Sequence, residues 1–167
     1  MSTLKRTLFS GSTCAAISLS LALLASPVAA QNPVTSLTLS GQVITFPAPT
    51  AADYINGFVN SATGVTFTVN ATAGNQSHTT TVLIRATSAN LGGGKVLADL
   101  QWRRSDLATW NSITSVNAAV EARTVVRNST NDPWNNTIFF RMILLWATDP
   151  NATRSANYSI TLSQTVP

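Results

Sequence analysis

Few residues in this 167-residue chain could do acid–base chemistry, and no spacing brings them together. His78 is the only histidine, and as a general base it would need a nucleophile and an orienting carboxylate that no motif marks. We therefore expect a solvated histidine at the start of a strand. Asp99, Asp106 and Glu121 could converge as the carboxylates of a glycoside hydrolase, but no pair is singled out. The sequence predicts a protein that is not an enzyme, with a hydrolase built on these acids as the third hypothesis.

Metal and cofactor motifs are equally sparse. The one cysteine, Cys14, and the one histidine cannot form a zinc site, and the six acidic residues are too scattered for an EF-hand loop. A calcium ion held by loop oxygens around residues 131–132 and 149–151 is left open. The glycine-rich segment 90–95 is not a phosphate-binding loop, because Lys95 is followed by Val96 where a Walker A motif has Ser or Thr. We predict no cofactor and a flexible connection in this segment.

Four tryptophans are many for a chain of this length. Trp102 and Trp146 fall on strand positions that face the core, where packing accounts for them. Trp134 follows Pro133 in a polar segment, and Trp110 lies in the return of a hairpin, so both are free to stack on a sugar ring. Trp134 and Trp110 are therefore the candidate ligand-binding residues, and a glycan is the candidate ligand.

The first thirty residues have the organisation of a secretory signal peptide. The basic pair Lys5 and Arg6 precedes an apolar stretch over 14–25 and small residues over 28–30. The stretch is shorter than the about 20 apolar residues that a membrane-spanning helix needs. We expect residues 1–30 to be removed, with residues 31–167 exported as one soluble domain, without a membrane span, to the periplasm, the cell surface or the medium.

The charge of the exported part does not favour nucleic acid. Without Lys5 and Arg6 the ten basic residues become eight against six acidic ones, and the formal net charge falls from +4 to +2. Basic and acidic side chains also interleave, unlike the basic stripe that phosphate binding requires. No cysteine is left, so packing and hydrogen bonds must hold the domain. We predict no nucleic-acid partner and no disulfide.

The exported part has the pattern of short strands separated by turns. Val65, Phe67 and Val69 alternate strictly with polar residues, as in a half-buried antiparallel strand. Further strands are predicted over 34–46 (two, around Gly41), 79–87, 96–103 with 109–113 as a hairpin, 120–126 with Val120, Ala122, Thr124 and Val126 inward and Glu121 outward, and 157–163. Because no amphipathic helix pattern follows residue 30, the sequence predicts an all-β, antiparallel β-sandwich of about eight to ten strands.

Segment 137–146 is the most apolar run of the exported part, and we expect the rest of the domain to be built around it. Its even and its odd positions are both apolar, so neither face can lie in water without cost. The odd positions Phe139, Ile143 and Leu145 are either covered by the polar loop 128–136 or form an interaction surface. In the second case subunits would associate there or add a strand at an open sheet edge.

Two pieces of the chain resemble immunoglobulin-like modules of bacterial secreted and surface proteins. The hairpin over 100–110, with Trp102 and Trp110, is similar to their aromatic-bearing C-to-C′ hairpin, and strands 138–146 and 157–163 are similar to their final two strands. These pieces cover roughly the C-terminal half of the exported part. The resemblance implies an immunoglobulin-like sandwich without the cysteine pair, and it implies no binding residue.

Together these observations predict a function without catalysis. The first hypothesis is an exported structural or interaction module of the bacterial cell envelope or surface, which binds a protein partner or other copies of itself. The alternative is a carbohydrate-binding module that uses Trp134 and Trp110.

Overall fold

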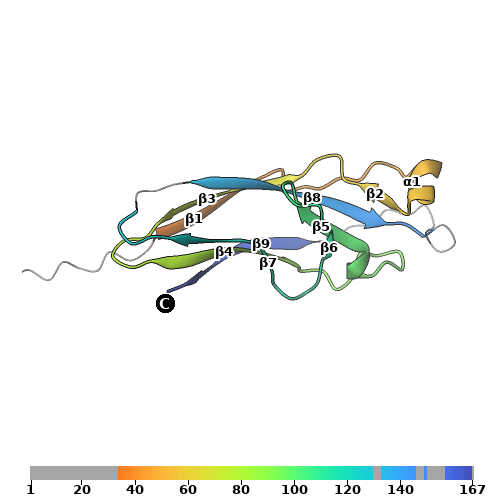
Figure 1. Ribbon diagram of the computed structural model, residues 1–167. Helices are drawn as coiled ribbons and strands as arrows, with labels where there is room; N and C mark the ends of the chain where they lie inside the picture. The colour runs from red at the N-terminus through yellow and green to blue at the C-terminus, as the bar shows by residue number, and fades with distance from the viewer. Residues whose placement is uncertain (1–33, 130–132, 146–148, 150–156, 167) are drawn as a thin grey trace, which may run out of the picture.

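The computed structural model describes residues 34–129, 133–145, 149 and 157–166, which form two antiparallel sheets in two layers (Figure 1). The larger sheet has the order β1-β3-β8-β5-β6, with β2 also paired to β8, and the smaller has the order β7-β4-β9. The strands are β1 (Val34–Ser40), β2 (Phe58–Asn60), β3 (Val65–Thr72), β4 (His78–Ala86), β5 (Leu100–Arg104), β6 (Asn111–Ser112), β7 (Ala118–Val125), β8 (Trp134–Ile143) and β9 (Tyr158–Thr165). The predicted all-β antiparallel sandwich is confirmed, and the chain, with its single cysteine, has no disulfide.

β8 is the strand around which the larger sheet is assembled. Its Met142 pairs with Leu100 of β5 on one side and with Val59 of β2 on the other. β3 follows β2 along that second side and pairs with residues 134–138. A central strand of this kind has its backbone donors and acceptors engaged on both sides.

The two faces of β8 are buried to different degrees. Ile138 and Phe140 point inward and are 0% exposed, whereas the odd positions from Thr137 to Ile143 are half-buried. The strand begins and ends three residues earlier than the predicted segment 137–146, at Trp134 and Ile143. Trp146, expected to be in the core, lies outside the described residues.

The core between the sheets follows from strict alternation. In β3, Val65, Phe67 and Val69 are 0% exposed and alternate with threonines, as predicted, and they belong to the same core cluster as Val82 and Ile84 of β4. Since the exported part is expected to have no cysteine, this apolar packing and the two ladders hold the domain.

One helix was not predicted. α1 (Ala51–Asn56) begins with a capping box, in which the Thr50 hydroxyl accepts from the Asp53 amide and the Asp53 carboxylate accepts from the Thr50 amide. It ends at Gly57, whose φ of 77° is the left-handed conformation that favours glycine at a helix end. The six residues are too few to show an amphipathic period, so only the caps could have predicted the helix.

The second strand expected in segment 34–46 is absent. β1 ends at Ser40, and Ile44 and Phe46 pack half-buried against the core without strand pairing. α1 and the short 3₁₀ helix η1 (Leu97–Asp99) are the helices of the described residues. Neither is long and apolar enough to cross a membrane.

Val120 of β7 is 6% exposed and inward, as predicted, but the predicted faces of Glu121, Ala122 and Thr124 are wrong, and a bulge is the reason. Val82 of β4 pairs with Glu121, but the next residue, Leu83, pairs with Ala119, so Val120 is an extra residue. A bulge of this kind reverses the faces that alternate side chains occupy. Glu121 is consequently 8% exposed instead of outward, and Val126, expected inward, is 63% exposed.

Candidate functional site

The outer face of the larger sheet contains the predicted interaction surface. Phe139 and Ile143 are half-buried there, and Leu145, just beyond the end of β8, is 54% exposed. Arg103 of β5 lies over the Phe139 ring, so β5 covers part of this face. The loop 128–136, the alternative cover, lies partly outside the described residues.

Two arginines and three aromatic rings form a cluster on this face. The guanidinium carbon of Arg103 lies 5.1 Å from the ring centroid of Trp110 and 5.4 Å from that of Phe139. The guanidinium carbon of Arg141 lies 4.6 Å from Trp110 and 4.9 Å from Phe58. We call these five residues the arginine–aromatic cluster, and they line a cleft of about 520 Å³. Distances below about 6 Å are those of favourable cation–π contacts.

Strand pairing assembles this cluster from distant segments. Arg103 is paired with Phe139 across β5 and β8, and Phe58 of β2 lies opposite Ile143 on the other side of β8. The predicted hairpin of β5 and β6 is confirmed, and Trp110 directly precedes β6. Arg141 of β8 therefore contacts residues from three other segments of the chain.

The positive charges of the cluster have neutral partners only. Arg141 Nε donates to Gln101 Oε1 at 2.7 Å, and Arg103 Nη1 donates to the Leu107 carbonyl at 2.8 Å. Within the described part of the chain, no carboxylate lies within 4.0 Å of either guanidinium. Partial burial and the like charge of Arg103 lower the pKa of Arg141.

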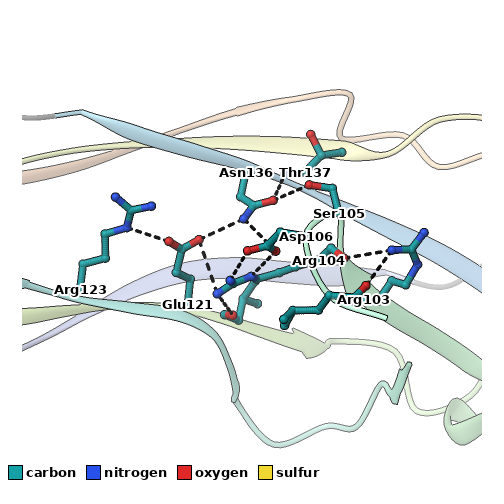
Figure 2. A network of polar contacts seen from close by, with 10 residues as sticks. Arg103, Arg104, Ser105, Asp106, Glu121, Arg123, Asn136 and Thr137 are labelled. Atoms are coloured by element: carbon teal, nitrogen blue, oxygen red, sulfur yellow. Dashed lines mark hydrogen bonds and ion pairs between the residues drawn. The ribbon is translucent and has the colours of Figure 1, made fainter. Parts of the chain in front are cut away.

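A second polar group closes one lateral side of the sandwich (Figure 2). Glu121 of β7 accepts from Arg123 Nε at 2.7 Å and lies 3.7 Å from Arg104 Nη1 of β5. Arg104 also binds Asp106, with 2.5 Å between Nη2 and Oδ2, and Asn136 of β8 donates to both carboxylates. These contacts join the larger sheet to the smaller one, and we call them the β5–β7 staple.

The contacts of the staple do not favour the hydrolase hypothesis. It brings Asp106 and Glu121 together, but both carboxylates lie against Arg104, whose hydrogen bond lowers the pKa of Asp106 to about 2. A glycosidase acid needs the opposite change, a raised pKa. Asp99, the third candidate, is not part of the staple and instead lies 3.7 Å from Lys95 Nζ.

Lys95 is held by contacts within the fold. Its ammonium group is buried, 2.6 Å from Asp149 Oδ2 and 2.6 Å from the Ile143 carbonyl at the end of β8. Asp149 also accepts from the Leu145 amide at 2.5 Å. The glycine-rich segment is a connection, as predicted, and its lysine is anchored to the chain beyond β8 instead of being free for a phosphate.

The other lateral side, between β1 and β9, is built differently. β1 pairs with β3 alone and β9 with β4 alone among the described strands, and neither contains a charged residue or a proline. Two side-chain hydrogen bonds join the two sheets on this side. The Tyr158 hydroxyl donates to the Gln42 carbonyl, and Gln164 Nε2 donates to Thr35 Oγ1. An apolar cleft of about 360 Å³ opens there, and its lining includes Leu39, Val43, Ile44, Phe46, Met142 and Ile160. We call this region the open side.

Two further residues lie where sequence reasoning did not place them. Trp134, expected in an exposed loop, is the first residue of β8, 6% exposed, with Arg123 over its ring at 5.2 Å. His78, expected to be solvated, begins β4 but is 1% exposed, and neither ring nitrogen has a hydrogen-bond partner. Trp102 is buried, as predicted. Trp134 packs on the core side and Trp110 on the outer face, so the structure does not bring the two candidate ligand-binding residues together.

The comparisons with known proteins add no family to this description. No protein-family model matches the sequence, and no curated protein matches it. β8 and β9 lie in different sheets, whereas the last two strands of an immunoglobulin domain share one. Membership of the immunoglobulin-like family therefore stays a prediction.

The predicted calcium alternative, at residues 131–132 and 149–151, falls mostly outside the described ranges. The described residues contain no group of three metal-ligating side chains.

Proposed function

We propose that this chain is an exported, non-enzymatic structural module of the bacterial cell envelope or surface, and that it associates with other copies of itself. The observation that carries the proposal is β1, an edge strand of seven residues next to an apolar cleft. Edge strands are usually protected by lysine, proline or a bulge, and β1 has none of these. Export is inferred from the signal-peptide pattern of residues 1–30.

The pattern of β1 suits pairing with a second copy. Antiparallel pairing about Leu37 would place Leu37 opposite Leu37 and Thr35 opposite Leu39, all on the half-buried face. Ser36 would then lie opposite Thr38 on the exposed face. No like charges meet in this arrangement, and Leu39 lines the apolar cleft, so the pairing is self-complementary around a twofold axis.

The absence of catalysis is supported by how the acidic side chains are used. Asp106 and Glu121 are tied to Arg104, Asp99 lies by Lys95, and Asp53 caps α1. Each therefore has a structural partner. The alternative platform of Trp134 and Trp110 is weakened because the Trp134 ring is buried, so the two rings do not form one exposed stacking surface.

The mass of the purified protein in solution tests the proposal. We expect light scattering after size exclusion to show a dimer or larger oligomer that dissociates on dilution. Thr38→Lys, which adds a charge to the exposed face of β1, should weaken association by about tenfold or more, because lysines from both copies would then meet near the axis. Thr124→Lys, the same change on the exposed face of β7, is the control and should leave association unchanged.

Two outcomes would contradict the proposal. One is a monomer at every concentration. The other is an oligomer that Thr38→Lys and Thr124→Lys affect equally, since that would place the contact elsewhere.

A further inference from the structure

We propose that the arginine–aromatic cluster on the outer face of the larger sheet is a binding site for an acidic saccharide, whose carboxylate or sulfate lies between Arg103 and Arg141. The site is on the sheet face, away from β1 and β9, and so it is independent of the proposed self-association. It extends the function from a module that contacts its own copies to one that also binds a charged polysaccharide.

The first argument is the uncompensated charge. Arg103 and Arg141 share contact with one ring, that of Trp110, and their described hydrogen-bond acceptors are the neutral Gln101 side chain and backbone carbonyls. The nearest charged network, the β5–β7 staple, contains Arg104, whose side chain points away from that of Arg103 (Figure 2). Two half-buried like charges without an anion gain most from an oxyanion, because a guanidinium binds a carboxylate or sulfate through charge-assisted hydrogen bonds.

The second argument is the shape and composition of the cleft. It is lined by Phe58, Trp110 and Phe139 in addition to the two arginines, and its volume of about 520 Å³ is in the range of small-molecule sites. Aromatic rings beside charged donors suit a ligand with flat apolar faces and a charged substituent, which is the chemistry of a uronate or a sulfated sugar ring.

The third argument separates a saccharide from a peptide. β8 is paired on both sides over the cleft, with β5 opposite residues 138–142 and β2 opposite residues 141–143. Its backbone groups are therefore not free to pair with an added strand. Recognition there must come from side chains, which favours the saccharide.

Isothermal titration with matched oligosaccharides tests this proposal on the purified protein. Oligogalacturonate supplies the carboxylate, its methyl ester has the same ring without the charge, and a carrageenan oligosaccharide supplies sulfate instead. We expect an acidic oligosaccharide to bind at least about tenfold more tightly than the methyl ester. Tighter binding of galacturonate identifies a carboxylate as the oxyanion, and tighter binding of carrageenan identifies a sulfate.

Two arginine variants locate the site. Arg141→Gln and Arg103→Gln should each weaken binding by about tenfold, whereas Arg85→Gln, which removes an exposed arginine of β4, should change it by less than about twofold. Thermal unfolding of each variant checks that the fold is kept. Trp110→Phe keeps an aromatic wall and should weaken binding less than Trp110→Ala.

Several results would overturn the proposal. These are equal affinity for the methyl ester, equal affinity for tetraglutamate, equal loss of binding in Arg85→Gln, and no binding of any acidic oligosaccharide at millimolar concentration. In the last case the arginines only cover the aromatic face of the sheet. None of these results bears on the dimer, because Thr38→Lys lies on another part of the molecule.

Discussion

The two lateral sides of this sandwich are closed by different physical means. On the β5–β7 side, Glu121 is 8% exposed and joins the sheets through Arg104 of β5. On the open side, β1 and β9 have no charged residue, and two side-chain hydrogen bonds border an apolar cleft. A charged network specifies its partners and repels others, whereas a neutral edge accepts any strand of matching pattern. Charged contacts thus join the sheets on one side, whereas the other side has neutral hydrogen bonds and the edge strand on which the proposed self-association rests.

The largest expected effect comes from breaking the staple. Glu121→Ala should lower the free energy of unfolding by about 2 kcal/mol or more, because Arg104, with a side chain 18% exposed, would lose its buried partner. Urea denaturation followed by tryptophan fluorescence measures this change. A loss below about 0.5 kcal/mol would mean that the network behaves as an ordinary surface ion pair and does not close this side.

The matched change on the open side should have a smaller effect. Gln164→Ala removes the hydrogen bond to Thr35, and we expect it to lower the free energy of unfolding by less than about 1 kcal/mol, because this bond is exposed and neutral. The same urea titration checks it. If Gln164→Ala costs as much as Glu121→Ala, the two sides are equally closed and the comparison fails.

Acid should weaken the stapled side selectively. The folded-state pKa of Asp106 is about 2, below its ordinary value of 3.8, because Arg104 hydrogen-bonds to the ionised carboxylate. Its contribution to stability is therefore complete above pH 3.8 and is lost as the pH falls through about 2. We expect the urea midpoint of Asp106→Asn to fall less than that of the parent protein between pH 5 and pH 2. Equal decline in both proteins would assign the acid sensitivity to other groups.

Alkali should weaken the open side, by the smallest of these effects. Burial raises the pKa of Tyr158 above its ordinary value of 10.0, so the folded state favours the neutral phenol. Its contribution is present below pH 10 and is lost as the pH rises through the folded-state pKa. Tyr158→Phe should make the urea midpoint less sensitive to pH between 9 and 11. An unchanged sensitivity would show that ionisation of Tyr158 is not coupled to unfolding.

Local patterns predicted the fold more successfully than the site. The alternation of Val65, Phe67 and Val69 predicted β3, and the β5–β6 hairpin was predicted with Trp102 in the core. α1 was missed although Thr50, Asp53 and Gly57 carried its start and stop signals, because a six-residue helix has too few turns for a hydrophobic period.

The candidate site residues were predicted only in part. Phe139 and Trp110 do lie on the outer face, but they belong to a cluster with Arg103, Arg141 and Phe58, which no motif joins. The strand pairing that unites them links positions up to 85 residues apart, as between Phe58 and Ile143. Trp134 was expected in an exposed loop but is buried, because β8 begins three residues before the apolar run that marked it.

Short strands with alternating apolar and polar residues can be predicted from the sequence alone, because successive side chains of a strand point to opposite faces. The sequence also determined that no cysteine chemistry, and no motif for a metal or a phosphate, organises residues 31–167. Only the tertiary structure decided which strands pair, where the bulge at Val120 turns Glu121 inward, and which edges are left open. These features depend on contacts between residues far apart in the chain, and a one-residue change in register moves every side chain of a strand to the opposite face.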